Sequence, residues 1–406
     1  MDMIFLTLGY PTNDNRSIYS DLMNEFVTRG HNVWVVCQSE RRNNTNTVLE
    51  KSNNVNVLRV RTGNLTEKVS LIEKGVTTLT IEKCFINAIK KYIHGVKFDL
   101  VIYSTPPITF CSVVQYMKKR DNAKSYLLLK DIFPQNAVDL GMIKNNGLLY
   151  KIFRKKEKKL YCLSDYIGCM SEGNRRYVID HNKEVDPTLV EVCPNSIDPL
   201  PMADRPGKEE VTMFRSKYSI PEDSLLIVYG GNIGKPQGIE FFIEALKELK
   251  DRNDLFFLVI GRGTEYYKIE NYLNSSGHGN ALLMEHMPTD EYKKLMRFCN
   301  VGLILLSDKF TIPNFPSRVT AYMEAGLPIL AATDANTDLK DMLRGSGCGL
   351  WSKSGDIPAF INNIDKLVLS KALRDRMGLA GRKWLEENYT VSKSYEIIMD
   401  HFKTGR

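Results

Sequence analysis

The segment LLIVYGGNIGKPQGIEFFIEALKELK, at residues 225–250, decides the fold. It opens with a short apolar run, passes through a glycine-rich turn, and continues with apolar residues at helical spacing. The next segment, FFLVIGRGTE at 256–265, opens in the same way. A buried strand, a glycine-rich turn and an amphipathic helix, in that order, predict a repeating unit of a parallel sheet covered by helices.

The same alternation extends in both directions along the chain. In the second half it predicts strands at 225–229, 256–260, 301–306 and 328–332, and helices at 238–250, 290–298 and 318–325. In the first half it predicts strands at 3–8, 33–37, 55–60, 99–104, 125–129 and 166–170, and helices at 17–29 and 80–94. Two parallel sheets are therefore expected, one in each half.

A proline-rich stretch separates the two halves. Prolines 194, 199, 201, 206 and 221 interrupt the pattern, which predicts a linker. We expect an N-terminal Rossmann-like domain at 1–195, a linker at 196–224 and a second Rossmann-like domain at 225–383. The last helix, 384–406, is expected to pack back on the first domain. The fold class is α/β, with two doubly wound domains facing a central cleft, where phosphorylated ligands bind at strand ends.

Composition excludes several classes of protein. The chain has 406 residues, 43% apolar and 25% charged, as a globular protein of two domains would have. It contains no apolar run long enough for a transmembrane helix, and MDMIFLTLGYP at the N-terminus is typical of a buried strand rather than a signal peptide. Eight cysteines without a C-x-x-C pair indicate reduced thiols, a cytoplasmic location and no metal site.

The excess positive charge lies in the first half. Residues 1–200 carry 28 Lys and Arg against 21 Asp and Glu, whereas the remainder is neutral. The segment NNGLLYKIFRKKEKKLY, at 145–161, combines apolar residues with six basic ones and predicts a basic amphipathic helix. Such a helix suits an anionic membrane surface, although a solvated surface helix is the alternative. No nucleic-acid-binding motif accompanies it, so nucleic acid is not an expected partner.

Two glycine-rich turns are candidates for phosphate binding. Gly231 permits close approach of the backbone to a phosphate, and Lys235 adds a positive charge. Gly261 and Gly263 repeat this arrangement in the following turn. Ordinary turns between strands and helices are the alternative in both places.

The segment IPNFPSRVTAYMEAG, at 312–326, is a third candidate. Ser317 is a suitable N-cap for the predicted helix, which would leave amide groups free for an anion. Arg318 can bind a diphosphate through two hydrogen bonds, and Glu324 can accept hydrogen bonds from ribose hydroxyls. A plain capped helix with a solvated arginine and glutamate is the alternative.

A candidate for acid–base chemistry follows the strand at 125–129. Lys130 and Asp131 come directly after apolar residues, at the predicted carboxyl edge of the sheet. An aspartate there can act as a general base on an acceptor hydroxyl, or it can simply cap the next turn.

Several segments together resemble family 4 of the GT-B glycosyltransferases over essentially the whole chain. They are FDLVIYSTPPITF (98–110), KDIFPQNAVDLGMI (130–143), GGNIGKPQG (230–238), FTIPNFPSRVTAYMEAG (310–326) and TDANTD (333–338). They are most similar to the branch that builds O-antigens and capsules, some of whose members are thought to transfer N-acetyl-L-fucosamine.

The resemblance implies a UDP-sugar donor in the second domain and a polyprenyl-diphosphate-linked sugar acceptor on the first, without an obligatory metal or other cofactor. Backbone amides after Gly231 and Ser317 would share the diphosphate with Arg318 and Lys235. The loop at 9–17 matches the acceptor-side loop of the family in position. The donor-binding candidates are Gly231, Asn232, Lys235, Gly261, Gly263, Ser317, Arg318 and Glu324; the acceptor-binding candidates are Asn15, Arg16 and Lys130; the catalytic candidate is Asp131.

Three questions stay open at this stage. The Glu-x7-Glu pattern common in the family falls on Pro313 and Ala321, which leaves both retaining and inverting transfer possible, the latter with Asp131 as base. A UDP-sugar epimerase of the same fold would use the same donor site. A non-catalytic protein that binds sugar nucleotides would also keep the fold.

Overall fold

The computed structural model describes residues 1–12, 15–65, 69–277 and 279–402. Two compact units make up the chain: unit 1 comprises Met1–Asp198 and Val391–Arg406, and unit 2 comprises Pro199–Thr390. Asn13 and Asp14 of the predicted acceptor-side loop, and residues 403–406 of the predicted last helix, lie outside the described residues.

Unit 1 is built on an eight-stranded sheet within the described residues, with the strand order β3-β4-β2-β1-β5-β6-β7-β8. Its strands are β1 (Asp2–Thr7), β2 (Asn32–Glu40), β3 (Val48–Ser52), β4 (Val55–Thr62), β5 (Leu100–Ser104), β6 (Lys124–Leu129), β7 (Tyr166–Cys169) and β8 (Val190–Val192). Its helices are α1 (Ile18–Thr28), α2 (Leu71–Tyr92), α3 (Cys111–Asp121), α4 (Gln135–Asp139), α5 (Leu148–Leu163), α6 (Glu172–His181) and α15 (Val391–Asp400).

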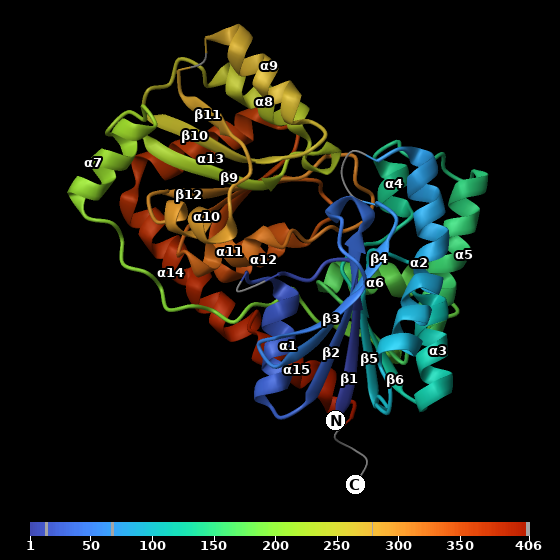
Figure 1. The fold of residues 1–406 in the computed structure, drawn as a ribbon. Helices are drawn as coiled ribbons and strands as arrows, with labels where there is room; N and C mark the ends of the chain where they lie inside the picture. Colours follow the sequence, from blue (N-terminus) through green and yellow to red (C-terminus); the bar gives the residue numbers. More distant parts are fainter. Residues whose placement is uncertain (13–14, 66–68, 278, 403–406) are drawn as a thin grey trace. The chain divides into compact units, whose positions relative to one another are not determined.

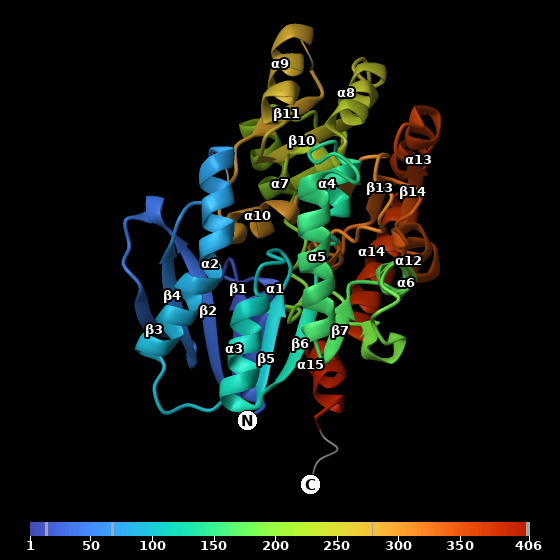
Figure 2. The same cartoon turned by 90° about the vertical axis from the view of Figure 1, so that its right-hand side faces the viewer.

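Helices cover both faces of this sheet. Figure 1 shows α1 and α15 on one face and α2, α3 and α5 on the other, and Figure 2 looks onto the second group. The core under α1 and α15 combines alternate strand residues such as Phe5 and Val35 with Phe26 of α1 and Ile398 of α15. β2 lies on one side of β1 and β5 lies on the other, so the strand order reverses at β1. The loops after β1, β5 and β6 lie at the carboxyl edge of the sheet, which is where such sheets bind ligands.

Unit 2 is built on a six-stranded parallel sheet within the described residues, with the order β11-β10-β9-β12-β13-β14. Its strands are β9 (Leu225–Asn232), β10 (Leu255–Arg262), β11 (Ala281–Met284), β12 (Val301–Leu305), β13 (Ile329–Thr333) and β14 (Gly349–Lys353). Its helices are α7 (Lys208–Lys217), α8 (Ile239–Glu248), α9 (Tyr266–Ser276), α10 (Thr289–Met296), α11 (Arg318–Glu324), α12 (Leu339–Ser346), α13 (Ile357–Leu369) and α14 (Lys371–Asn388).

The predicted strand at 225–229 lies at the centre of unit 2. β9 pairs with β10 on one side and β12 on the other, and this is where the strand order reverses. Ile227 and Phe257 pack with Phe242 of α8 and Phe360 of α13 in a continuous apolar core. The glycine-rich end of β9, which pairs with β10, therefore lies at the point where parallel sheets of this kind bind ligands.

The sheet of unit 1 differs from the prediction at one edge. β3 runs antiparallel to β4, so the sheet is mixed rather than wholly parallel. Asn53 and Asn54 join the two strands, with φ angles of 47° and 65°. A two-residue hairpin of this type needs positive φ at both positions, which asparagine tolerates better than most residues.

The crossing between the units also differs in its boundaries. Helix α14 continues to Asn388, and residues 384–390 belong to unit 2. A separate helix, α15, returns to unit 1, where the Val391 amide donates to the carbonyl of Ile197 and the Tyr395 ring lies 4.9 Å from that of Phe26. The predicted linker, 196–224, contains helix α7.

Candidate active site

Arg318 is the central cation of unit 2 at the end of β9. Its guanidinium carbon lies 4.4 Å from the centroid of the Tyr229 ring. A Cβ atom added to Gly231 would come 3.3 Å from Arg318 Nη2, so glycine gives the guanidinium its place against the strand. Arg318 Nη1 is buried, and no hydrogen bond within the described residues satisfies it. Burying an N–H group of a cation without an acceptor is unfavourable, so this arrangement favours a bound anion.

The environment of Arg318 keeps it charged. Burial lowers its pKa, but the hydroxyl groups of Tyr229 and Tyr322 favour the charged form, and the net effect raises the pKa of Arg318 above its usual value. The aromatic face of Tyr229 stabilises the guanidinium through a cation–π contact. The site is therefore positively charged and largely desolvated, where a diphosphate would be bound strongly.

Two backbone amides of the first glycine-rich turn, those of Ile233 and Gly234, already have acceptors within unit 2, and diphosphate binding by the amides of this turn stays a prediction. The Ile233 amide donates to the carbonyl of Arg262 at 2.9 Å, because the pairing of β9 with β10 extends to the ends of both strands. The Gly234 amide donates to Gln237 Oε1 at 3.0 Å, and Asn232 Nδ2 donates to the same oxygen at 3.1 Å. Asn232 thus braces the turn, and its donor-binding role stays a prediction.

Close packing against the first glycine-rich turn requires glycine at positions 261 and 263. A Cβ atom on Gly261 would lie 1.9 Å from the carbonyl oxygen of Gly231, and one on Gly263 would lie 2.2 Å from that of Ile233. The second glycine-rich turn therefore lies directly against the first. This contact explains both glycines without a ligand, and their part in donor binding stays a prediction.

Ser317 does not cap α11 in the way the sequence predicts. It occupies the N-cap position, but its backbone is in the right-handed helical region and its side chain forms no capping hydrogen bond. The amides of Val319 and Thr320 instead donate to the carbonyls of Pro316 and Ser317, both at 3.3 Å, which makes the turn tight. Lys235, which begins a 3-10 turn at Lys235–Gln237, has an exposed side chain.

Glu324 already has partners within unit 2. One carboxylate oxygen lies 3.0 Å from Lys293 Nζ, and the other accepts a hydrogen bond from the Leu200 amide at 3.0 Å. Residues three apart on a helix share a side, whereas residues six apart do not. Ala321, which is at the position of the family's glutamate, is three residues after Arg318 and lies near the same side of α11. Glu324 is six residues after Arg318 and lies on a different side of the helix. A ribose contact by Glu324 stays a prediction.

In unit 1, Asp131 is held in a defined position after β6. Asn136 Nδ2 donates to both carboxylate oxygens, at 2.7 and 2.8 Å, and the Asp131 amide donates to Thr105 Oγ1 at 3.1 Å. Burial raises the pKa of Asp131 to about 6, against the opposing effect of hydrogen bonds from Ile132 and Asn136. The N-cap of α4 is Pro134, so Asp131 does not cap that helix. These properties suit a general base near neutral pH.

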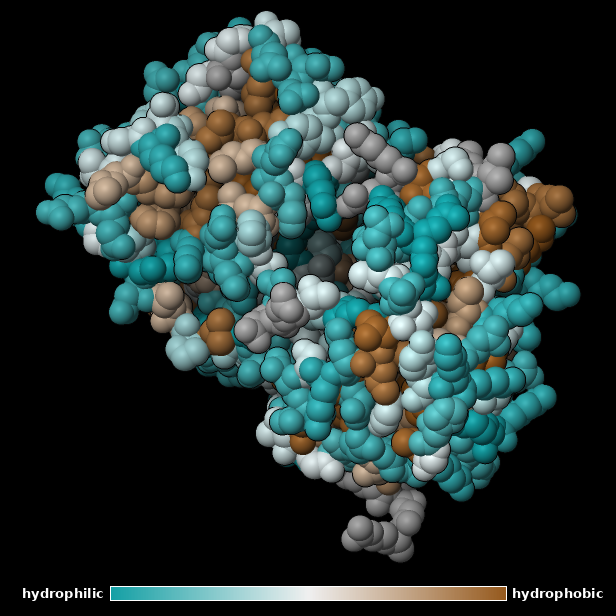
Figure 3. Space-filling view, viewed as in Figure 1, coloured by the Kyte–Doolittle hydropathy of each residue, from teal (hydrophilic) through white to brown (hydrophobic). Residues whose placement is uncertain are grey.

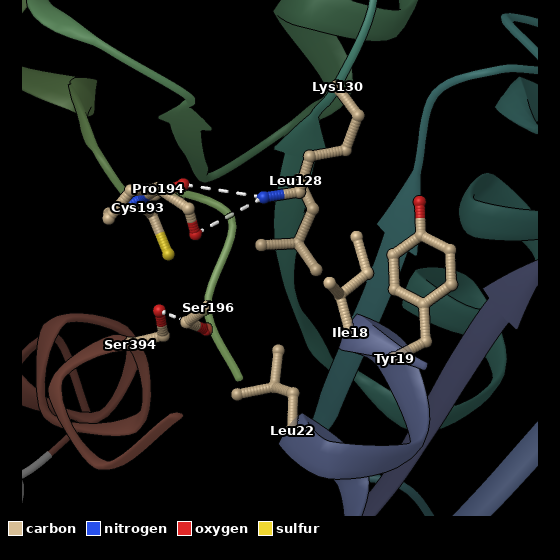
Figure 4. A pocket seen from close by; sticks show the side chains of 9 residues that line it. All are labelled: Ile18, Tyr19, Leu22, Leu128, Lys130, Cys193, Pro194, Ser196 and Ser394. Carbon is tan, nitrogen blue, oxygen red and sulfur yellow. Dashed lines mark hydrogen bonds between the residues drawn. The ribbon is translucent and has the colours of Figure 1, made fainter. Parts of the chain in front are cut away.

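Lys130 points away from the solvent. Its Nζ atom lies 3.4 Å from the carbonyl oxygens of both Cys193 and Pro194, in a small cavity that also contains Tyr19 and Ser394 (Figure 4). Burial lowers the pKa of Lys130. The side chain joins the end of β6 to the segment that follows β8. Its predicted contact with an acceptor stays a prediction, and it would require the ammonium group to leave these carbonyls.

Arg16 and Asn15 precede α1 in the loop after β1. Arg16 Nη2 lies 2.6 Å from Asp21 Oδ2, Arg16 Nε lies 3.1 Å from Asp21 Oδ1, and Nη2 also donates to the carbonyl of Asp198. The two-point pair with Asp21 stabilises the start of α1, and the hydrogen bond to the Asp198 carbonyl joins it to the end of the first segment of unit 1. Asn15 is exposed. The acceptor-binding role of both residues stays a prediction.

The predicted basic helix is α5, and its exposed face is apolar near the start of the helix and basic further along. Leu148 and Ile152 are 76% and 44% exposed, and Lys155 and Lys159 follow them at helical spacing on the same face. Glu157 is buried, where it pairs with Arg154 at 2.6 Å.

Met142 and Leu149 are also exposed. The space-filling view shows an apolar patch over the end of α5 near α4, with hydrophilic residues along the rest of the helix (Figure 3). An apolar end with a basic stripe beside it suits an anionic interface.

No helix within the described residues is long and apolar enough to cross a membrane. No group of three or more His, Cys, Asp or Glu side chains there is placed to hold a metal ion.

Comparison with known families covers both units. Residues 18–199 match the model described as "Glycosyltransferase Family 4", and residues 211–384 match that of "Glycosyl transferases group 1". The protein is a glycosyltransferase of the GT-B type, which confirms the predicted fold class of two doubly wound Rossmann-like domains and the assignment as a transferase.

Its relatives are named as glycosyltransferases, one of them in capsular polysaccharide biosynthesis. The chain is 24% identical to the "probable glycosyltransferase WbjE" of Pseudomonas aeruginosa, over 81% of this chain and 80% of the relative. It is 23% identical to the capsular polysaccharide biosynthesis glycosyltransferase CapM of Staphylococcus aureus, over 64% of this chain and 66% of the relative.

Solved structures show the same fold at low identity. Sucrose-phosphate synthase of Thermosynechococcus elongatus is similar over the whole of both chains, with a TM-score of 0.76 and 15% identity. Anabaena HepE, solved in complex with UDP, is similar over the whole of both chains, with a TM-score of 0.68 and 11% identity.

Sequence reasoning missed the partners of the principal side chains. Tyr229 directly precedes the glycine pair at 230–231. That position could have indicated a residue that contacts the candidate ligand-binding arginine. Asn136 lies within the quoted segment that contains Asp131, five residues downstream. Thr105 is distant in sequence and is brought to Asp131 only by the pairing of β5 with β6.

Proposed function

We propose that this glycosyltransferase moves a sugar from a UDP-sugar to a polyprenyl-diphosphate-linked saccharide in the synthesis of a bacterial surface polysaccharide. The observation that carries the proposal is the buried Nη1 of Arg318 at the end of β9, which no hydrogen bond within the described residues satisfies. HepE, which shares the fold, binds UDP, and CapM is named for capsular polysaccharide synthesis; both support this choice of donor and pathway. N-acetyl-L-fucosamine is the candidate sugar.

The donor site would stabilise the leaving diphosphate with cations. Arg318 is planar and rigid against the Tyr229 ring, so it can direct two N–H groups at phosphate oxygens with little loss of side-chain entropy. Exposed Lys235 can approach the same ligand from the neighbouring turn. As the sugar–phosphate bond breaks, negative charge grows on the diphosphate, and these groups bind it more strongly than in the ground state. We expect turnover without an added metal ion.

Asp131 would activate the acceptor. Its carboxylate is ionised at neutral pH, is desolvated, and is oriented by Asn136, so it can accept the proton of an attacking hydroxyl group. In this scheme the hydroxyl oxygen forms the new bond to the anomeric carbon, UDP leaves with the bonding electrons, and the proton remains on Asp131. The proposal implies inversion at the anomeric carbon.

The α5 surface would bring the enzyme to its lipid-linked acceptor. The exposed apolar residues at the start of α5 can enter the interface of a membrane, while the lysines along the same face contact anionic headgroups. A peripheral position at the cytoplasmic face of the membrane follows, since polyprenyl-linked acceptors are confined to lipid.

The decisive experiment incubates the protein with a panel of UDP-sugars, with and without a polyprenyl-diphosphate-linked sugar, in the presence of EDTA. The expected result is one UDP-sugar consumed only when the acceptor is present, with UDP and an extended lipid-linked saccharide as products. Release of an epimerised sugar without acceptor would identify an epimerase instead. Binding of UDP-sugar without turnover under any condition would identify a non-catalytic protein.

A further inference from the structure

The hydroxyl group of Tyr292 is a second buried polar atom without a partner at the end of β9. Tyr292 lies on α10, and no hydrogen bond within the described residues satisfies its Oη atom. A Cβ atom added to Gly230 would lie 2.1 Å from this oxygen, so only glycine leaves the phenol its position against the strand. A buried hydroxyl without a hydrogen bond is unfavourable by comparison with a phenylalanine ring of the same shape.

Tyr292 and Arg318 face neighbouring residues of the same strand end. The phenol of Tyr292 occupies the space that a side chain on Gly230 would need, and the guanidinium of Arg318 lies next to the space that a side chain on Gly231 would need. Side chains normally alternate between faces of a strand, but the φ angle of 126° at Gly231 interrupts that alternation. The charge of Arg318 also acts on the phenol, lowering its pKa against the larger effect of burial.

The hydroxyl groups of the other two tyrosines near Arg318 have backbone hydrogen-bond partners. Tyr322 Oη lies 3.2 and 3.1 Å from the carbonyl oxygens of Val228 and Leu303, either of which can accept its single hydroxyl hydrogen, and it accepts from the Gly230 amide at 3.3 Å. Tyr229 Oη donates to the carbonyl of Asn232 at 2.5 Å. The hydroxyl of Tyr292 interacts with that of Tyr322, which affects the pKa of both groups, but within the described part of unit 2 no contact of hydrogen-bond length satisfies Tyr292 Oη. Burial raises the pKa of Tyr292 well above its usual value, so the group remains a donor at neutral pH.

We propose that Tyr292 is a donor-binding residue whose hydroxyl donates a hydrogen bond to a diphosphate oxygen beside those bound by Arg318. The inference rests on the proposed function, since it assigns a further residue to the same donor site. Arg318 supplies the charge, and the neutral phenol adds a directed hydrogen bond from a second helix. Together they would hold neighbouring oxygens of the diphosphate at the Gly230–Gly231 pair.

The test compares the full-length wild-type protein with Tyr292→Phe, using UDP, inorganic pyrophosphate and uridine as probes in calorimetry. The substitution keeps the ring and removes one oxygen that has no partner, so the thermal unfolding temperature should not fall. A hydrogen bond to a charged phosphate predicts about 10-fold to 100-fold weaker binding of UDP and pyrophosphate, with uridine unaffected. Tyr218→Phe is the matched control, since Tyr218 packs on Phe214 in the same unit.

Each outcome decides the matter. Unchanged binding of UDP and pyrophosphate to folded Tyr292→Phe overturns the inference, and so does an equal loss for uridine, which would indicate a packing role. If the wild-type protein binds pyrophosphate but not UDP, the proposed donor is wrong. Tyr292 is then judged on pyrophosphate alone, and a loss there still supports it. A wild-type protein that binds neither probe overturns both proposals.

Discussion

Replacing Arg318 by alanine tests the donor site most directly. The guanidinium is buried, has no carboxylate partner within the described residues, and lies 4.4 Å from the centroid of the Tyr229 ring. Its contribution without ligand is small, because a cation–π contact of about 1–2 kcal/mol is offset by a buried N–H group without a partner, which costs about 1–3 kcal/mol. The stability of the ligand-free protein should therefore change little.

The bound state should respond differently. Hydrogen bonds from a cation to a phosphate contribute about 1.5–3 kcal/mol, which corresponds to a loss of affinity for UDP of about 10-fold to 150-fold. UDP at 100 times its Kd should stabilise the wild-type protein by about 2.7 kcal/mol and the variant by much less. Arg318→Lys should fall between the two, because lysine keeps the charge but loses the planar contact with Tyr229.

Calorimetry with UDP, and thermal unfolding with and without UDP, measure both effects. Arg344→Ala is the matched control, since it removes the same charge from an exposed position on α12 of the same unit. A folded Arg318→Ala protein that binds UDP as tightly as the wild type would refute the reasoning. A large loss of stability without ligand would also contradict it, since the guanidinium would then have a structural partner.

The remaining predictions concern unit 1. Asp131→Asn is nearly isosteric but cannot accept a proton, so turnover should fall by about 10²–10⁴ with UDP affinity intact; activity near wild type would place the base elsewhere. Because the pKa of Asp131 is raised to about 6 and the ionised form is the base, kcat/KM should rise with pH through about 6, and a profile that is flat between pH 5 and 7 would contradict this. Reversing Lys155, Lys156 and Lys159 to Glu should abolish sedimentation with anionic vesicles, while activity on a short-chain soluble acceptor survives; sedimentation of the triple variant at low salt would show that α5 is not the anchor.

The sequence by itself determined the fold class and the order of most elements. The apolar run before the glycine-rich turn at 230–238 predicted β9, because a strand covered on both faces must be apolar throughout. The antiparallel strand β3 was not predicted, since its residues are mostly exposed and carry no continuous apolar run. Its hairpin depends on the positive φ angles of Asn53 and Asn54, and asparagine pairs also occur in ordinary loops.

The tertiary structure alone decided which predicted groups are available for chemistry. Sequence spacing marked Arg318 and Asp131, because charged residues beside apolar ones at strand and helix ends stand out in a linear pattern. It could not show that Arg318 lacks a counter-ion, or that the amides of Ile233 and Gly234 are already used. Hydrogen bonds and burial depend on residues distant along the chain, such as Tyr292, which only the packing of α10 against β9 brings to Gly230.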